Sequence, residues 1–502
     1  MKLFLARWIA LAGIAGPVYA GADADHGLWI ENVTVVSPER DQPLPGATVK
    51  IQNERIVQIV QSRAGKRPPG TQVIDAHGLF LTPGLIDGHV HLREIPGMLP
   101  DQERAHPDIA TAAREQFPKS YLYFGFTTLV DLASSREALA PWNAQPLHPD
   151  TYFCGGVPVV DGYPSNFVPQ AVRYQAMPFF LVESGTAALP PGIDAAEHTP
   201  QAVVASMHAQ GAICVKTFYE HGFGANHDLP VPSLASIKAL VEAAHAAGLP
   251  VLLHANSSEA QEFGLRAGVD IFAHGLWNWR EGYRVATLTP DVTRILQGVL
   301  DGRRGYEPTI QVLYGEQGLM DEKILSDPRM VKAIPASLIE WYRSPQGQWY
   351  HDAFAKREGV APSERPSNVD AGAIAHVNQV VSFLAQHDAR LLFGSDTPSD
   401  ETFANPPGLN GWLEMQRLVA AGVSAAQLFR ALTIADAEAF GLSQDIGTVQ
   451  VGKRANLLLL NADPTRTIQA YDKIQKVILA GRLIDPDTLA ADRVAHPTPA
   501  AP

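Results

Sequence analysis

Short apolar runs alternate with helical patterns through the middle of the chain. Apolar strands that alternate with helices predict a parallel sheet covered on both faces. Eight such strands favour a closed (β/α)8 barrel, a TIM barrel, over a doubly wound sheet. The eight runs are residues 85–91, 127–131, 152–160, 212–218, 251–255, 270–274, 307–313 and 390–396.

Both ends of the chain instead carry short strand patterns separated by turn residues. We therefore predict an α/β protein in which residues 21–83 and 444–486 pair into one small β-sandwich domain. The barrel is expected over 84–443, with an insertion around 315–373, and a flexible tail over 487–502. The terminal strand patterns are residues 28–35, 47–52, 55–60 and 72–75, and then 447–450, 455–460, 474–480 and 482–484.

The first twenty residues, 1–20, have the pattern of a secretory signal peptide. Lys2 and Arg7 supply positive charge, residues 8–16 are apolar, and the stretch ending at Ala20 is typical of a cleavage site. The apolar run is too short to span a membrane. We expect an exported protein, periplasmic or secreted, with no stable membrane span after cleavage; the alternative is a disordered N-terminal extension.

The composition restricts the possible binding partners more than it restricts the possible functions. A formal net charge of −13 at pH 7 without any basic run argues against nucleic-acid binding. We expect a small-molecule substrate, and the sequence leaves a homo-oligomer open. Cys154 and Cys214 lie in apolar strand patterns, so we expect buried free thiols in preference to a disulfide.

Ionisable residues recur at the ends of the predicted barrel strands. The first strand ends in His89 and His91, which point to the same side because residues i and i+2 of a strand do so. The carboxyl ends of barrel strands meet at one face, where catalytic residues gather. Taken singly, each residue could be a satisfied core histidine, a surface lysine or a helix cap; taken together, they predict one metal site. The set is His89, His91, Lys216, His254, His274 and Asp396.

This arrangement resembles the amidohydrolase superfamily, specifically its branch with two metal ions. The resemblance rests on the stretch from Pro83 to His91, on the lysine and the two single histidines, and on Gly394-Ser395-Asp396. It also includes the segment from Gly447 to Leu460. It is closest to the imidazolonepropionase-like and amino-acyl dipeptidase-like members.

The resemblance implies two divalent metal ions held by five of these residues. His89, His91 and Asp396 would hold the more buried ion. His254 and His274 would hold the second. Zinc is the default metal for imidazole and carboxylate ligands, although manganese, cobalt and iron share them.

The resemblance also implies a reaction. Lys216 would carry a CO2-derived carbamate that bridges both ions, because a free ammonium is a poor ligand. A metal-bridging hydroxide would attack a substrate carbonyl, with Asp396 as general base and then general acid. The reaction would be hydrolysis of an amide or cyclic amide C–N bond in a small molecule, such as an N-acyl amino acid or a dipeptide.

Two alternatives stay open from the sequence. The same site would serve for ester, lactone or phosphoester hydrolysis, because the activated water is indifferent to the leaving atom. From another class, the chain could be a non-catalytic binding protein on this barrel. Such a protein is expected to lack at least one of the six residues, and none is missing.

Three further residues are candidates for substrate binding. Tyr219 lies three positions after Lys216, His221 follows in the same loop, and Tyr163 follows the third strand. Loops at the carboxyl ends of barrel strands commonly carry binding residues. For each of the three, packing without substrate contact is the alternative.

Overall fold

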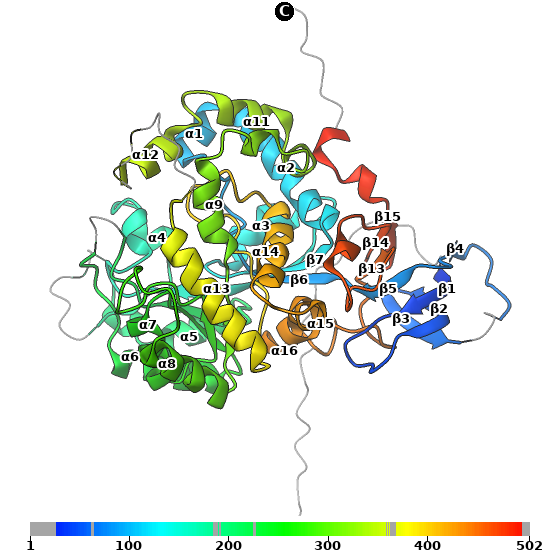
Figure 1. The fold of residues 1–502 in the computed structure, drawn as a ribbon, viewed down its shortest axis with the longest axis horizontal. Helices are drawn as coiled ribbons and strands as arrows, with labels where there is room; N and C mark the ends of the chain where they lie inside the picture. The colour runs from blue at the N-terminus through cyan, green and yellow to red at the C-terminus, as the bar shows by residue number, and fades with distance from the viewer. Residues whose placement is uncertain are drawn as a thin grey trace, which may run out of the picture.

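The structure is a computed structural model that describes residues 27–493, apart from 62–64, 184–188, 190–191, 224–226, 358, 360 and 362–367. Two sheets organise this part of the chain (Figure 1). The predicted signal peptide, residues 1–20, lies outside the described residues. None of the helices described is long and apolar enough to cross a membrane.

One sheet is the barrel, whose seven regular strands are all parallel to their neighbours and run in the order β12-β11-β10-β9-β8-β7-β6. Sequential strands are therefore adjacent, as in a ring of β/α units. Their bounds are β6 Leu85–Val90, β7 Phe126–Asp131, β8 Asp150–Val157, β9 Cys214–Phe218, β10 Val251–His254, β11 Ile271–Ala273 and β12 Gly305–Glu307.

The eighth position in the ring is filled by residues 390–397, which pair as isolated bridges instead of a regular strand. Leu391 bridges Tyr306 of β12, and Thr397 bridges Val90 of β6, both in parallel. This segment therefore joins the last regular strand to the first and closes the ring. The TIM-like barrel predicted from the eight apolar runs is confirmed.

One predicted barrel strand is displaced. The run 307–313 was expected to be a strand, but β12 ends at Glu307, and Pro308 has no N–H to continue the ladder. The helix α9 (Gln311–Leu319) follows instead. The buried carboxylate of Glu414 accepts two backbone N–H groups at the start of this helix, at 3.0 and 2.6 Å. The contact with Glu414, about a hundred residues away in the sequence, thus favours a helix start over a strand in the apolar run 307–313.

Helices cover the outside of the barrel (Figure 1). Thr199, Ser233, Ser257 and Thr289 cap α5 to α8, and each side-chain oxygen accepts a backbone N–H from the first turn. The longer helices around the barrel are α2 Pro107–Tyr123, α3 Arg136–Asn143, α5 Pro200–Ala209, α6 Leu234–Ala246, α7 Ser258–Ala267, α8 Pro290–Asp301, α13 Ala371–Gln386 and α14 Leu409–Ala420. Shorter helices are α1 Pro100–Ala105, α4 Arg173–Ala176, α15 Ala425–Arg430 and α16 Asp436–Ala439.

The predicted insertion after β12 is largely helical. It contains α9 and then α10 (Met330–Ala333), α11 (Ala336–Arg343) and α12 (Trp349–Arg357). Trp349 Nε1 donates a hydrogen bond to the carbonyl oxygen of Gly97 at 2.9 Å, so the insertion packs on the loop that follows the first barrel strand. This contact places α12 beside the loop at the carboxyl end of β6, where the predicted site lies.

The N- and C-terminal segments pair in one eight-stranded sheet, in which β13 runs antiparallel to β5. In Figure 1 the blue and red strands accordingly lie together beside the barrel. Residues 447–450 form no strand, and the two layers of a sandwich are not confirmed. The strands are β1 Leu28–Val35, β2 Leu44–Gln52, β3 Arg55–Val60, β4 Gln72–Asp75, β5 Phe80–Pro83, β13 Leu457–Leu460, β14 Lys476–Leu479 and β15 Arg482–Ile484.

The flexible tail expected from residue 487 is wrong for its described part. Leu489 is 1% exposed, and its carbonyl oxygen accepts a hydrogen bond from Gln116 of α2 at 2.8 Å. Lys332 of α10 pairs with Asp492 at 2.7 Å. Residues 487–493 therefore pack on the barrel helices, and residues 494–502 lie outside the described part.

Cys154 and Cys214 form a disulfide, so the expectation of free thiols is wrong. The two residues are directly opposite each other in the β8–β9 register, with their Cα atoms 4.5 Å apart. Both are buried inside the barrel among Ile86, Leu252 and Leu392. The apolar pattern placed both cysteines in buried strands, but it carried no information about the register between two strands sixty residues apart.

Candidate metal centre

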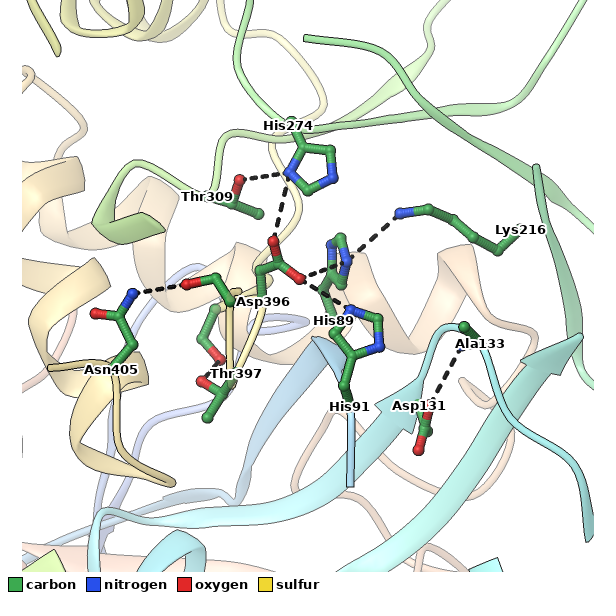
Figure 2. A network of polar contacts seen from close by, with 12 residues as sticks. His89, His91, Asp131, Ala133, Lys216, His274, Thr309, Asp396, Thr397 and Asn405 are labelled. Atoms are coloured by element: carbon green, nitrogen blue, oxygen red, sulfur yellow. Dashed lines mark hydrogen bonds and ion pairs between the residues drawn. The ribbon is translucent and has the colours of Figure 1, made fainter. Parts of the chain in front are cut away.

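Asp396 lies at the centre of a buried polar cluster at the carboxyl ends of the barrel strands (Figure 2). Its Oδ1 is 3.1 Å from His89 Nε2 and 3.0 Å from His91 Nε2, and its Oδ2 is 3.7 Å from His274 Nδ1. Burial alone would raise the pKa of Asp396, but the neighbouring imidazoles outweigh it and hold this pKa well below its usual range. The carboxylate is therefore ionised and presents both oxygens to the histidines.

The first barrel strand supplies His89 and His91 as predicted. His89 is 1% exposed on β6, and His91 follows directly after the strand ends, where its backbone N–H donates to the carbonyl oxygen of Thr397 at 2.7 Å. Their ring centroids are 5.5 Å apart. Burial lowers the pKa of His91, yet the charge of Asp396 outweighs it and raises this pKa to about 9. Asp396 Oδ1 thus lies within 3.1 Å of Nε2 of both the His89 and the His91 rings.

Lys216 projects from β9 into the same cluster. Its side chain is buried, and Nζ lies 3.4 Å from His89 Nε2 (Figure 2). Burial lowers the pKa of Lys216 to about 8, although the charges of Asp396 and Glu307 act in the opposite direction. This burial excludes the surface ion pair that was the alternative for Lys216.

His254 and His274 complete the cluster from β10 and from the residue after β11. Their ring centroids are 4.4 Å apart, and His274 is 5.1 Å from His89. Burial lowers the pKa of His254 and takes that of His274 well below its usual range. Both rings are therefore neutral, which is the form of imidazole that binds metal ions. Thr309 Oγ1 lies 3.0 Å from His274 Nδ1 and orients that ring.

The assembled side chains fit a centre for divalent metal ions. One ligand atom from each of His89, His274 and Asp396 lies within 4.8 Å of the other two. Imidazole nitrogen and carboxylate oxygen are the usual donors to zinc. The cluster is also buried, so a cation bound there would lie against an ionised carboxylate away from bulk water.

The three predicted substrate residues have different surroundings. The Tyr163 ring is 4.7 Å from the His254 ring, which brings Tyr163 to the cluster. The Tyr219 hydroxyl instead donates to Glu259 of α7 at 2.8 Å, and His221 Nε2 is 3.8 Å from the same carboxylate. Tyr219 and His221 thus pair with a helix residue that sequence spacing could not indicate.

Two buried carboxylates at strand ends were missed by sequence analysis. Asp131 ends β7, and its Oδ2 accepts the backbone N–H of Leu92 at 3.0 Å. Glu307 ends β12, and its Oε2 is 3.3 Å from His89 Nδ1. Asp131 was already the last residue of the predicted run 127–131, so its position at a strand end could have marked it as a candidate site residue. Glu307 was placed at the start of a predicted strand, so its position could not mark it in the same way.

The family model described as "Amidohydrolase family" matches residues 80–274 and 356–484. The match begins in β5, the strand before the one that carries the first histidine pair, and ends with β15, the last strand of the terminal sheet. The unmatched residues between the two ranges contain most of the helical insertion. The six predicted metal-site residues all lie in the matched ranges.

Known relatives share shorter stretches of sequence. A dihydroorotase from Lactococcus lactis is 34% identical over 115 residues, which cover 22% of this chain and 23% of that protein. An imidazolonepropionase from Anaeromyxobacter dehalogenans is 42% identical over 72 residues, or 13% of this chain and 17% of that protein. The chain thus spans about a quarter or less of the length of these curated relatives.

Solved structures match over nearly the whole chain. A Xaa-Pro dipeptidase with bound methionine in the active site has a TM-score of 0.61 and 18% sequence identity, covering 91% of this chain and 100% of that chain. At this identity the likeness concerns the fold. The family model, by contrast, covers more than half of the chain. The chain therefore belongs to the amidohydrolase family.

Proposed function

We propose that this protein is a metal-dependent hydrolase that cleaves an amide or cyclic amide C–N bond in a small molecule, such as an N-acyl amino acid or a dipeptide. The observation that carries the proposal is the convergence of strand-end histidines and Lys216 around the ionised Asp396. Family membership and the dihydroorotase relative support a C–N bond as the target.

The donor set would divide between two ions. His89, His91 and Asp396 would hold one ion, and His254 and His274 would hold the second. Imidazole and carboxylate donors favour zinc. When bound, such ions supply acidified water and polarise a substrate carbonyl.

Lys216 would join the two ions as a carbamate. Its neutral amine forms an N–C bond to the carbon of CO2 and releases one proton, which converts the neutral side chain into an anionic one with two oxygen donors. Starting from the ammonium form, two protons are released in all. Burial supports this modification, because it lowers the pKa of Lys216 to about 8 and so favours the neutral amine. An unmodified ammonium at this position would instead repel a bound cation.

Asp396 would move the proton during hydrolysis. Its neighbouring imidazoles hold the carboxylate ionised, so Oδ can take a proton from the attacking water. As the carbonyl carbon gains its C–O bond and loses its C–N bond, the leaving nitrogen takes that proton from Asp396. The side chain thus returns to its ionised form after each cycle.

Aromatic side chains beside His254 favour a substrate with an apolar group. The Tyr163 ring centroid is 5.7 Å from that of Phe167 and 5.6 Å from that of Phe223. Phe167 is 64% exposed and Phe223 is 38% exposed, which leaves apolar surface for a ligand to cover. We expect a bulky apolar or aromatic acyl group or side chain to bind there.

Two parts of the proposal rest on sequence alone. Export to the periplasm or outside the cell rests on the signal pattern of residues 1–20. Ester, lactone or phosphoester hydrolysis is the second candidate activity, because the same residues would activate water toward any of these bonds. A non-catalytic binding protein is disfavoured because all six residues are present and assembled.

A hydrolysis screen tests the proposed activity. Zinc-reconstituted protein is offered N-acyl amino acids, dipeptides, cyclic amides, lactones and phosphoesters, with Asp396→Asn and the surface control Asp301→Asn in parallel. We expect C–N bond cleavage that falls by roughly 10²- to 10⁴-fold in Asp396→Asn and is unchanged in Asp301→Asn. Turnover of lactones or phosphoesters alone, or full activity in Asp396→Asn, would contradict the proposal.

A further inference from the structure

Glu307 is a buried carboxylate beside the candidate metal centre. It is 0% exposed at the end of β12, and neither Oε1 nor Oε2 accepts a hydrogen bond in the described part of the structure. A carboxylate removed from water is costly unless a donor or a cation faces it. The groups around Glu307 therefore indicate the role of this side chain.

The His89 ring faces Glu307 at ion-pair distance. Glu307 Oε2 lies 3.3 Å from His89 Nδ1, and Nδ1 is itself buried without a hydrogen bond. The other nitrogen of the ring, Nε2, lies 3.1 Å from Asp396 Oδ1 and 3.4 Å from Lys216 Nζ. One edge of the ring thus faces Glu307 and the other faces the metal-site residues.

Glycines on both sides leave room for this contact. A Cβ atom on Gly88 of β6 would lie 3.2 Å from Glu307 Oε1 and 2.9 Å from a backbone carbonyl oxygen. A Cβ atom on Gly394 would lie 2.5 Å from His89 Cβ. Larger residues at either position would push the carboxylate or the ring out of place, so the backbone is shaped around the pair.

We propose that Glu307 is a positioning residue for His89. With the ring protonated on Nδ1, the carboxylate would accept this N–H across the 3.3 Å that separates the two atoms, which would leave Nε2 unprotonated and able to bind a metal ion. The inference rests on the proposed function, since it takes His89 as a metal ligand. Carboxylates that accept the second N–H of a metal-bound histidine fix its tautomer and orientation, and their loss typically costs 10- to 100-fold in metal affinity.

The test compares two variants at Glu307 with a control at another buried carboxylate. Glu307→Met removes the acceptor and keeps most of the volume, whereas Glu307→Gln keeps an oxygen that can accept Nδ1–H. Glu414→Gln is the control because Glu414 is also 0% exposed but contacts the backbone of α9. Zinc affinity is measured on the full chain by competition with a chromophoric chelator.

We expect Glu307→Met to bind zinc about 10- to 100-fold more weakly, Glu307→Gln to retain most of the affinity, and Glu414→Gln to match the wild type. In ¹⁵N-histidine NMR spectra of the metal-free protein, with His89 assigned from a His89→Asn variant, the ring should carry its proton on Nδ1. In Glu307→Gln this preference should persist, and in Glu307→Met it should shift toward Nε2.

Two results would overturn the assignment of Glu307. One is unchanged zinc affinity in a folded Glu307→Met protein; the other is a wild-type His89 ring that carries its proton on Nε2. Failure of the proposed function looks different, because the wild type itself would then not bind zinc. The tautomer of His89 in the metal-free protein still decides the role of Glu307 in that case, and also if Glu307→Met does not fold.

Discussion

At the residue scale, the site depends on side chains whose charges are set by burial and by each other. Asp396 stays ionised because imidazoles surround it, whereas His254 and His274 stay neutral because they are buried. Lys216 lies in the same buried cluster with a pKa lowered to about 8. An ionised carboxylate, two neutral imidazoles and a buried lysine thus lie in a single cluster, beside His91, whose pKa is raised to about 9.

The aromatic residues beside this cluster support a prediction about specificity. Replacing Phe167 and Phe223 together by alanine removes apolar surface that a bulky substrate group would cover. We expect kcat/KM to fall by about 10- to 100-fold for substrates with an aromatic group, since burying such a side chain contributes about 1.5–3 kcal/mol. Steady-state kinetics on paired aromatic and acetyl substrates measure this.

The control for this prediction is Val57→Ala, which truncates an exposed apolar side chain on β3 of the terminal sheet. Acetyl substrates should be affected less than threefold in the double variant, because they reach the rings poorly. An equal loss for both substrate classes would show that the rings support the loop and do not select the substrate.

At the scale of elements, the stability of the contact between α14 and the start of α9 should depend on pH. Burial raises the pKa of Glu414 from its usual 4.5 to about 8, although the two backbone N–H groups that it accepts act in the opposite direction. The folded protein then holds a proton that the unfolded chain releases above about pH 4.5. Stability from this group is therefore complete below about pH 4.5 and is lost as pH rises to about 8.

Glu414→Gln keeps an acceptor for the backbone but cannot ionise, so it isolates this effect. Between pH 4.5 and 8 the stability of the wild type should fall relative to that of the variant, by at most about 1.4 kcal/mol per pH unit. Thermal unfolding temperatures of the two proteins at matched pH and zinc concentration measure the difference. A constant difference across this range would show that Glu414 does not titrate as described.

The elements also show where sequence patterns stop being informative. Alternating apolar runs and helical patterns predicted the barrel because a parallel strand buried on both faces is apolar at nearly every position. A short stretch of sequence is enough to show this pattern. They misplaced the seventh strand, because Pro308 and the distant Glu414 turn the run 307–313 into a helix start. They could not pair Cys154 with Cys214, since strand register is set by the whole barrel.

At the scale of the whole molecule, the barrel explains why the convergence of the six strand-end residues could be predicted and the surroundings of the loop residues could not. Strand ends of a closed barrel must meet at one face, so His89, Lys216 and Asp396 could be brought together without knowing any contact. Tyr219 and His221 lie in a loop, and their directions depend on Glu259 of a neighbouring helix. Loop side chains of this kind are set by tertiary contacts that spacing does not encode.

The pairing of the two chain ends adds a constraint on the same site. β5 leads through Gly84 directly into β6 and its histidines, and β5 is held by β13 from the far end of the chain. The first metal-site strand is therefore anchored from both sheets. Large movements of His89 relative to the barrel are not expected when substrate binds.

We propose a site for two metal ions that Lys216 would bridge, and the metal content of the protein tests this proposal most directly. Elemental analysis is made on the wild type, Lys216→Ala and the exposed control Lys238→Ala after reconstitution with zinc and removal of the excess. We predict about two ions per chain in the wild type and in Lys238→Ala, and one or fewer in Lys216→Ala. One ion or fewer in an active wild-type sample, or two in Lys216→Ala, would contradict the claim.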